Sequence, residues 1–288
     1  MKKFDDVAIG IVLYNPDILL LEQTINNIKE ITSDIYFIDN NSKNKKEVQK
    51  LLKEYLVIFN DNNYGIAKAL NQLLDIAFAN GKKYLLTLDQ DSRMNFNCFK
   101  EMYKFNNLQN VAIICPIIKD LNKLTTKTIK NEYQFVNRCI TSGSLMNLKI
   151  CKNIKKFDEK MFIDYVDFDY CKNVICSGYK IVKVRDAVLE HEVGKRIKRK
   201  FLFWTVYPTN HTPQRVYYFS RNIRYYLYKY KNCLTFKEYI HDLIHLIWKF
   251  INIVMYEKNK KEKLKMYKKG IIDYRLEEKN DNSCNGTI

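Results

Sequence analysis

The sequence predicts an α/β protein built on a mostly parallel sheet that is flanked by helices. Short apolar runs of strand length recur at residues 7–13, 35–38, 57–59 and 84–88. Segments with apolar residues at helical spacing separate these runs. Strict alternation of strand and helix is typical of a parallel sheet covered on both faces.

Turn and cap residues mark where these first elements begin and end. Asp17 precedes an apolar helical pattern and can cap it. A second helix runs from residue 66 to Asn80-Gly81, a suitable carboxyl-terminal cap. The run at 84–88 is short and apolar, which predicts a strand buried on both faces.

Beyond residue 95 the pattern predicts further strands and helices. In order they are a strand at 111–115 ending at Pro116, a surface excursion over 119–138, a strand at 142–146, a helix ending at Ser177-Gly178, and short strands at 181–184 and 187–189. We therefore expect three parts: an α/β domain over 1–212, a helical, basic and amphipathic extension over 213–275, and a disordered tail over 276–288.

The composition is that of a basic globular protein. Lys and Arg outnumber Asp and Glu by 49 to 32, which gives a net charge of +17. Such a charge favours nucleic acid, anionic lipid or phosphorylated small molecules as partners. The first residues lack a secretory signal, and no apolar run reaches the about 18–20 residues that span a bilayer. These features predict a cytoplasmic protein.

The eight cysteines contain no Cys-x-x-Cys pair and no histidine at ligand spacing. This argues against disulfides and against a zinc site. Reduced thiols packed as small apolar side chains are the expected state.

Polar residues follow four predicted strands at the point where each strand ends. The four clusters are Tyr14-Asn15, Asp39-Asn40-Asn41, residues 61–65, and Asp89-Gln90-Asp91. The carboxyl ends of parallel strands meet at one edge of a sheet, so these clusters should converge on one crevice. Asn and Asp there can accept hydrogen bonds from a ribose or from a uracil or thymine imide. Gly65, before a helix, would let a diphosphate or sugar approach the helix's positive end.

Asp89 and Asp91 are two close carboxylates that repel each other unless a cation lies between them. Oxygen ligands suit Mg²⁺ or Mn²⁺ shared with substrate phosphates. The alternative is a solvated loop without a metal. The chain carries neither a Gly-x-Gly-x-x-Gly fingerprint nor a P-loop, which argues against ordinary dinucleotide and P-loop nucleotide binding.

The second half of the chain supplies further titratable side chains. Asp164, Asp167 and Asp169 lie within six residues, and one of them could take a proton from an acceptor hydroxyl. The alternative is an acidic first turn of a helix, and for Asp169 this interpretation is at least as well supported as a catalytic role. His191 follows a predicted strand and could complete a metal site as neutral imidazole, although a structural histidine is the common case.

Together these stretches resemble an inverting family 2 glycosyltransferase with the A-type fold, a Rossmann-like mostly parallel sheet flanked by helices. Within that family they resemble the rhamnosyltransferase-like branch that builds bacterial surface polysaccharides. The matching stretches are Leu13-Tyr14-Asn15, Asp39-Asn40-Asn41-Ser42, residues 62–67 with Asn71, Asp89-Gln90-Asp91-Ser92, Ser142-Gly143-Ser144, residues 162–171 and His191. They cover about residues 7–195 in the family's order.

The resemblance implies a role for each matched position. Asp39 would contact the base or ribose, and Asp89 the ribose or donor sugar. Asp91 would bind the Mn²⁺ or Mg²⁺ that bridges the diphosphate, joined by His191, and Asp167 would be the catalytic base. The other nucleotide-sugar residues implied are Tyr14, Asn15, Asn41, Asn63, Gly65, Lys68 and Gln90. Those implied on the acceptor side are Ser142, Gly143, Asp169, Arg221 and Asn222.

Two departures from the family pattern refine this expectation. The pair Val166-Asp167 stands where many relatives carry Glu-Asp, so Asp164 is expected to share the role of base. The Gln-x-x-Arg-Trp motif of processive synthases is absent, which points to one sugar per encounter. The implied reaction is direct displacement with inversion. The implied donor is dTDP-rhamnose or a UDP-sugar, and the implied acceptor is lipid-linked or glycan.

The basic stretches at 195–203 and 214–270 mix cations with aromatic and aliphatic residues. A solvated charged surface is the plain interpretation. The sharper one is a peripheral protein on the inner, anionic leaflet of the cell membrane. Two other function classes stay open. A nucleic-acid-binding protein would use the same basic surface but leaves the polar clusters unexplained. A metal-dependent nucleotidyl- or phosphoryltransferase would share the aspartates but usually carries a phosphate loop, which we do not find.

Overall fold

The computed structural model describes residues 3–120, 129–191, 199–201, 204–206 and 208–284. The chain divides into two compact units. Unit 1 comprises Met1–Glu159 and Val166–Val193, and unit 2 comprises Lys160–Tyr165 and Gly194–Ile288. This division differs from the predicted boundary at residue 213. One reason is that residues 160–165 are hydrogen-bonded to a helix of unit 2 far along the chain.

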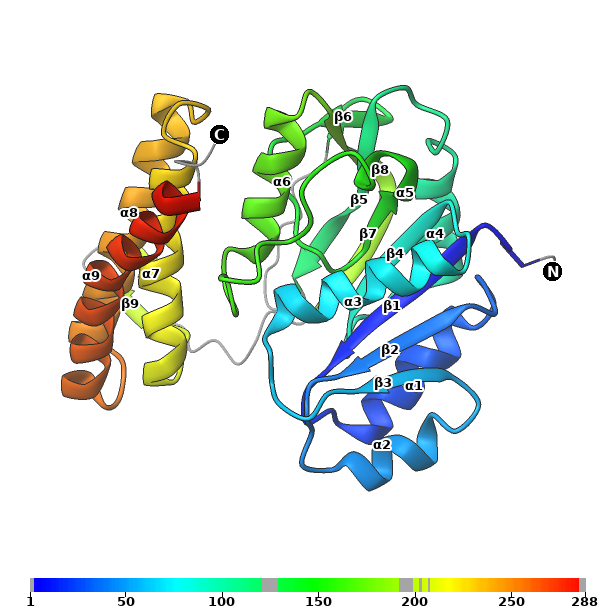
Figure 1. The fold of residues 1–288 in the computed structure, drawn as a ribbon, viewed down its shortest axis with the longest axis horizontal. Helices are drawn as coiled ribbons and strands as arrows, with labels where there is room; N and C mark the ends of the chain where they lie inside the picture. The colour runs from blue at the N-terminus through cyan, green and yellow to red at the C-terminus, as the bar shows by residue number, and fades with distance from the viewer. Residues whose placement is uncertain (1–2, 121–128, 192–198, 202–203, 207, 285–288) are drawn as a thin grey trace. The chain divides into compact units, whose positions relative to one another are not determined.

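Unit 1 is built around a sheet that has eight strands in the described part of the chain, in the order β3-β2-β1-β4-β7-β5-β8-β6 (Figure 1). Its first four strands are β1 (Val7–Leu13), β2 (Ile35–Asp39), β3 (Leu56–Phe59) and β4 (Tyr84–Asp89). All pairings among them are parallel, so their carboxyl ends share one edge. This confirms the prediction from the alternating pattern.

The second half of the sheet is mixed. Its strands are β5 (Val111–Asp120), β6 (Tyr133–Phe135), β7 (Ser144–Asn147) and β8 (Lys180–His191). Strand β7 runs antiparallel between β4 and β5, while β5 and β8 are parallel and β6 is antiparallel to β8. The predicted surface excursion over 119–138 thus contributes β6 to the sheet.

Two predictions about these strands are wrong, for one shared reason. Strand β5 does not end at Pro116, and the strands predicted at 181–184 and 187–189 are the single strand β8. The register shifts between Cys115 and Ile117, opposite the polar pair Arg185-Asp186. Proline lacks an amide hydrogen and is tolerated at such an irregularity. Pro116 and the polar pair Arg185-Asp186 predict the end of a strand, but the structure has only an irregularity within two continuous strands.

Six helices accompany this sheet among the described residues of unit 1. They are α1 (Ile18–Ile28), α2 (Lys45–Leu51), α3 (Ile66–Ala79), α4 (Phe96–Tyr103), α5 (Leu148–Cys151) and α6 (Val166–Cys176). Asp17 caps α1 as predicted, because its Oδ1 accepts from the amides of Leu19 and Leu20 at 3.0 and 3.2 Å. Helix α3 ends at Ala79 with Asn80 as its C-cap, before Gly81 in the left-handed region, which confirms that prediction too.

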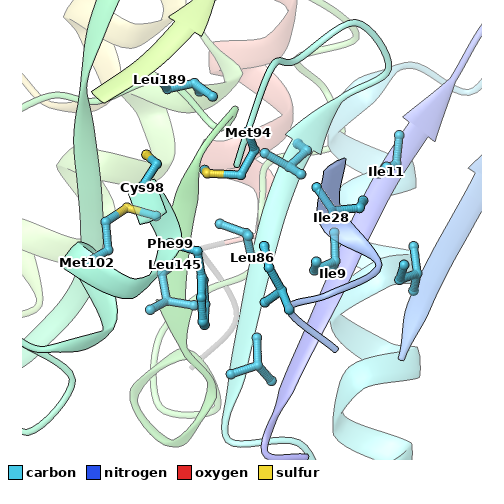
Figure 2. Close-up of a cluster of buried hydrophobic side chains, with 14 of the residues drawn as sticks. Ile9, Ile11, Ile28, Leu86, Met94, Cys98, Phe99, Met102, Leu145 and Leu189 are labelled. Atoms are coloured by element: carbon cyan, nitrogen blue, oxygen red, sulfur yellow. The ribbon is translucent and has the colours of Figure 1, made fainter. Parts of the chain in front are cut away.

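Helices pack on both faces of β1. Ile9 and Ile11 belong to a buried cluster with side chains of α1, β4, α4 and β7, several of which Figure 2 shows. Gly10 points to the other face, because side chains alternate along a strand. A Cβ at Gly10 would lie 2.9 Å from Leu73, so glycine lets α3 approach β1 closely.

In its described residues, unit 2 contains three helices and a short antiparallel pair of strands, β9 (Arg199–Phe201) and β10 (Trp204–Val206). Its helices are α7 (Pro213–Lys229), α8 (Phe236–Met255) and α9 (Lys260–Cys284). A Cβ at Gly270 of α9 would lie 2.5 Å from the carbonyl oxygen of Tyr217 on α7, so these two helices pack closely. The predicted helical extension is confirmed.

The predicted disordered tail differs from the structure up to residue 284. Helix α9 continues to Cys284, and the residues that extend it past 275 include Leu276 and Glu277, which are strong helix formers. The rest of the predicted tail, residues 285–288, lies outside the described residues.

Candidate functional site

The four polar clusters lie at one edge of the sheet, and hydrogen bonds connect them. The amide of Tyr14, just after β1, donates to Oε1 of Gln90 after β4 at 2.9 Å. The next amide, of Asn15, donates to Oγ of Ser42 after β2 at 2.8 Å. Asn15 takes a left-handed φ of 48°, which asparagine tolerates better than most residues. The end of β1 is thus tied to the loops of both neighbouring strands.

Buried amides connect the loops after β2 and β3. Asn40 donates through Nδ2 to the carbonyl of Gly65 at 3.0 Å and accepts from Asn60 at 2.9 Å. Gly65 has a φ of 84° and its amide donates to Oδ1 of Asn63 at 3.0 Å. These bonds fix the amino end of α3, whose first turn has no side-chain cap. Such an end, with free amide groups, is suited to an anionic ligand.

Asp39, the last residue of β2, is completely buried. Its Oδ1 accepts from the amide of Ser42 at 2.9 Å. Its Oδ2 has no hydrogen-bond partner among the described residues. A buried carboxylate oxygen without a donor costs free energy, and such oxygens usually mark a place where a missing donor binds. Asp39 is therefore the clearest ligand-directed group at this edge.

Two serine hydroxyls anchor the loop after β4. The amide of Asp89 lies 3.1 Å from Oγ of Ser92 and 3.2 Å from Oγ of Ser142, and these hydroxyls are 2.5 Å apart. Gly143 has a φ of 82°, and a Cβ there would lie 2.8 Å from Leu189. The structure thus brings the predicted residues Ser142 and Gly143 beside Asp89. In the sequence Ser92 is only the last residue of a matched motif. That its buried hydroxyl holds the backbone of Asp89 was not predicted.

The loop after Asp91 lies beside the end of β8. An isolated antiparallel bridge joins Arg93 to Glu190, the residue before His191. This brings the backbones of the two predicted metal-binding segments together, while the side chain of His191 lies outside the described part. No group of three or more His, Cys, Asp or Glu side chains within the described ranges could form a metal cage.

Lys68, predicted to bind the nucleotide-sugar, forms an ion pair with Glu159 at 3.2 Å. Glu159 also accepts from Nδ2 of buried Asn71 at 2.8 Å. Both side chains of the ion pair are about half exposed, and exposed pairs of this kind are weak. Lys68 therefore keeps its ammonium available at the start of α3.

The acidic residues 167 and 169 lie in the first turn of α6, where the helix dipole favours carboxylates. Asp169 is 2% exposed, in line with the first-turn interpretation. Asp167 is half-buried, and its Oδ1 accepts from the amide of Phe168 at 2.9 Å. Of these two carboxylates, Asp167 is the more accessible.

Asp164 belongs to unit 2 and is bound by Arg215 of α7. Nη2 of Arg215 lies 2.9 Å from Oδ1, and Nε lies 3.1 Å from Oδ2. A two-point pair of this kind is strong and directional. It favours a structural role for Asp164 over that of a base. Arg215 was not identified from the sequence, because 51 residues separate the partners and no local pattern links them.

Arg221 and Asn222 are buried and support the same loop. Nδ2 of Asn222 donates to the carbonyls of Ile163 and Asp164, both at 2.9 Å, and its Oδ1 accepts from Nε of Arg221 at 3.0 Å. The loop needs support, because Asp164 and Tyr165 take left-handed φ angles of 65° and 67°. Each such angle costs about 1–2 kcal/mol. The described contacts of Arg221 and Asn222 are thus those of positioning residues, and a direct role at the acceptor stays a prediction.

A cavity of about 170 Å³ lies in unit 1 between β5, β8 and the segment before β7. Its lining includes Arg138, Cys139, Ser142, Phe168 and Lys183. The guanidinium of Arg138 lies 5.1 Å from the centre of the Phe168 ring, a cation–π contact. No local sequence pattern predicts this basic cavity beside the first turn of α6.

Comparisons with known proteins agree with this geometry. The family model described as glycosyl transferase family 2 matches residues 8–162, more than half of the chain. The match contains all four polar clusters. The dTDP-rhamnosyl transferase RfbF of Shigella flexneri is 28% identical over 280 residues, which are 89% of this chain and 91% of that protein.

Two solved structures show the same fold. One is S. aureus TarS 1–349, with a TM-score of 0.58 and 12% identity, over 93% of this chain and 80% of that one. The other is GalNAc-T7 with UDP, GalNAc and Mn²⁺, with a TM-score of 0.56 and 14% identity, over 77% of this chain. The chain spans about half, 49%, of the length of GalNAc-T7. These likenesses confirm the predicted A-type glycosyltransferase fold.

The family match decides between the three function classes that the sequence left open. It covers the strands, the linked loops and the buried carboxylate that form the edge of the sheet. A nucleic-acid-binding protein or a nucleotidyltransferase does not account for this match. The chain therefore belongs to glycosyl transferase family 2 and is a glycosyltransferase.

Proposed function

We propose that the chain moves one sugar from a nucleoside-diphosphate sugar to a hydroxyl of a glycan or lipid-linked acceptor, with inversion at the anomeric carbon. Rhamnose from dTDP-rhamnose is the first candidate donor, because a relative at 28% identity is described as a dTDP-rhamnosyl transferase. UDP-sugars are the second. One observation carries the proposal. Oδ2 of Asp39 is buried and has no hydrogen-bond partner among the described residues, and it lies at the edge where four polar loops meet.

The base of the nucleotide would supply the donor that Asp39 lacks. Uracil and thymine carry an imide N–H, which complements a carboxylate acceptor, whereas adenine has no such group. Asn15 and Asn41, both exposed at the rim of the same edge, would reach the ribose. Gly65 and the uncapped first turn of α3 would receive the diphosphate, with Lys68 beside it.

The donor set fits a divalent cation that is shared with the substrate. Asp91, with Asp89 and His191, would hold Mn²⁺ or Mg²⁺, which usually take one or two carboxylates and complete their shell with phosphate and water. When bound, the ion would neutralise charge that grows on the departing diphosphate.

Asp167 would act as the base. As the acceptor oxygen bonds to the anomeric carbon, the carboxylate takes the hydroxyl proton, and the bond from that carbon to the diphosphate oxygen breaks on the opposite face. Asp167 is half-buried at the start of α6. Asp164 would instead position this segment through its ion pair with Arg215. Ser142 and Gly143, beside Asp89, would border the acceptor.

Helix α8 supports attachment to a membrane surface. No helix in the described residues is both long and apolar enough to span a bilayer. Yet α8 turns two of its charged residues, Asp242 and Lys249, inward and exposes apolar ones. The exposed apolar side chains on α8 are Phe236, Tyr239, Ile244, Ile247, Phe250, Val254 and Met255. With the net charge of +17, this face suits the inner, anionic leaflet, where a lipid-linked acceptor would lie.

The nucleotide assignment is tested by Asp39→Asn. The variant keeps the oxygen that faces Ser42 and replaces the unpartnered oxygen by an NH₂ group. We expect dTDP and UDP to raise the melting temperature of the wild-type protein, and ADP not to. In Asp39→Asn the affinity for dTDP and UDP should fall about ten- to hundredfold, the effect of losing a hydrogen bond worth about 1.5–3 kcal/mol.

The matched control for this experiment is Asp75→Asn, which removes a carboxylate from the exposed surface of α3. It should bind dTDP as the wild type does. Equal stabilisation by ADP, or unchanged dTDP binding in Asp39→Asn, would contradict the assignment of Asp39 to the base.

Removal of the cation should weaken diphosphate binding through Asp91. With EDTA in place of Mn²⁺ or Mg²⁺, we expect the wild-type affinity for dTDP to fall at least about tenfold, equivalent to 1.4 kcal/mol. Asp91→Asn should show the weaker affinity with or without metal, measured by titration calorimetry. Thymidine, which has no phosphates, should bind equally in all cases. A metal effect that survives in Asp91→Asn would argue against this site.

Asp167→Asn should lower kcat by about 10²–10⁴-fold with little change in KM, because it removes proton transfer but not binding. Both constants are measured from the rate of product formation with dTDP-rhamnose or a UDP-sugar as the donor. Asp186→Asn, at an exposed Asp–Arg pair, is the control and should keep its activity.

Asp164→Asn should lower the melting temperature of the protein instead of its turnover. If Asp164→Asn lost turnover by the same factor without losing stability, the role of base would pass to Asp164.

Ile247→Glu should release the protein from vesicles that contain phosphatidylglycerol. Burying an isoleucine side chain contributes about 1.5–3 kcal/mol to binding. The affinity for the vesicles, measured by sedimentation, should therefore fall at least about tenfold. Leu19→Glu, at a residue that is 72% exposed on α1, is the matched control and should sediment as the wild type does. Continued sedimentation of Ile247→Glu would exclude α8 as the attachment surface.

A further inference from the structure

Three cysteines from distant parts of the sequence meet in unit 1. Sγ of Cys139 lies 3.5 Å from Sγ of Cys171, and the amide of Cys139 lies 3.4 Å from the same sulfur. Cys115 of β5 contributes a third thiol, which lines the same cavity as Cys139. Cys115 and Cys171 are each 2% exposed, whereas Cys139 is half-buried. The cluster is thus more than the apolar packing that the sequence predicted for these thiols.

The cluster has access to a ligand-sized space. Cys115 and Cys139 line the cavity of about 170 Å³, together with the cations Arg138 and Lys183. A small reagent in this cavity would meet a thiol beside positive charge. That environment is typical of reactive cysteines, because it stabilises the thiolate.

Exposure selects one thiol of the three, because Cys139 is half-buried and lines the cavity, whereas Cys115 and Cys171 are almost fully buried and Cys171 does not line it. Contacts with Cys115 and Cys171, and with Ser144 and Lys183, lower the pKa of Cys139. Contacts with Cys139 and burial raise the pKa values of Cys115 and Cys171. Elsewhere in unit 1, burial raises the pKa of Cys98 to about 12. Cys139 is therefore the nucleophile and Cys171 the thiol in reach of it.

We propose that Cys139 is a modification site that reacts with peroxides entering the cavity, and that Cys171 resolves the product as a disulfide. The Cys139 thiolate attacks a peroxide oxygen, so that an S–O bond forms, the O–O bond breaks, and hydroxide leaves. Cys171 then gives up its proton and attacks the Cys139 sulfur, so that the S–S bond forms, the S–O bond breaks, and the departing hydroxide takes the proton and leaves as water. Two thiols lose two electrons, and hydrogen peroxide is reduced to two waters.

The bridge would connect two segments that the proposed function uses. Cys171 lies one helical turn after Asp167 on the same side of α6. Cys139 lies three residues before Ser142, whose hydroxyl accepts from the amide of Asp89. The sulfurs must approach each other by about 1.5 Å to bond, so one of these segments must move. Oxidation should therefore slow sugar transfer, a consequence that rests on the proposed function, whereas the thiol chemistry does not.

The test treats the full chain with hydrogen peroxide, alkylates the remaining thiols, and maps the peptides by mass spectrometry. In the wild type we expect a Cys139–Cys171 disulfide that a reducing agent reverses. Cys139 should react at least about tenfold faster than Cys98, whose thiolate fraction is far smaller. Cys171→Ser should accumulate a Cys139 sulfenic acid that dimedone traps, and Cys139→Ser should form no bridge. Cys233→Ser, at an exposed thiol, is the matched control and should form the bridge normally.

Two results would overturn the proposal. One is peroxide reacting at the exposed thiols Cys176 and Cys233 while Cys139 stays reduced. The other is dimedone failing to label Cys139 in Cys171→Ser, a measurement that does not depend on how well Cys139→Ser folds. Activity of the reduced wild type is recorded in parallel. Lack of transfer by the reduced enzyme would count against the proposed function alone, because the thiol map is read without substrate.

Discussion

Parallel pairing of β1 with β2 and β4, and of β2 with β3, brings the ends of four strands to one edge of the sheet. Everything at the site depends on this constraint. Short hydrogen bonds from the loop after β1 to Gln90 and Ser42 then fix the loops against each other. Because the strands are rigidly packed between helices, these loops need few contacts of their own to present their polar groups in a defined arrangement.

The fold accepts local costs in each of the two units. Asp39 is buried with one oxygen unpartnered among the described residues, and Asp164 and Tyr165 take left-handed backbone angles just before α6. Such costs persist only where the surroundings determine the conformation strongly. At the loop of unit 2, Arg215 and Asn222 provide that support with directional hydrogen bonds. A ligand that donates a hydrogen bond to Asp39 would remove the first cost on binding.

Two features of the chain extend the picture beyond sugar transfer itself. Helix α8 reverses the usual arrangement by burying Asp242 and Lys249 while exposing residues such as Ile247. The buried ammonium group of Lys249 lies 2.8 Å from the carboxylate of Glu257, so its charge is paired. The apolar side chains on the outer face of α8 remain exposed. The thiol cluster around Cys139 likewise joins a charged cavity to the helix that carries Asp167. Membrane attachment and thiol oxidation are thus the two proposals that go beyond the transfer reaction.

The sequence by itself determined the first four strands, the caps of α1 and α3, and the polar clusters, because hydrophobic period and turn chemistry are local signals. It also indicated Asp39 as a site residue, since that residue ends a strand. The tertiary structure decided the antiparallel β7, the continuation of β5 past Pro116, and the partners of Asp164 and Cys139. These depend on pairing and packing between residues far apart in the chain, and no local pattern encodes such a contact.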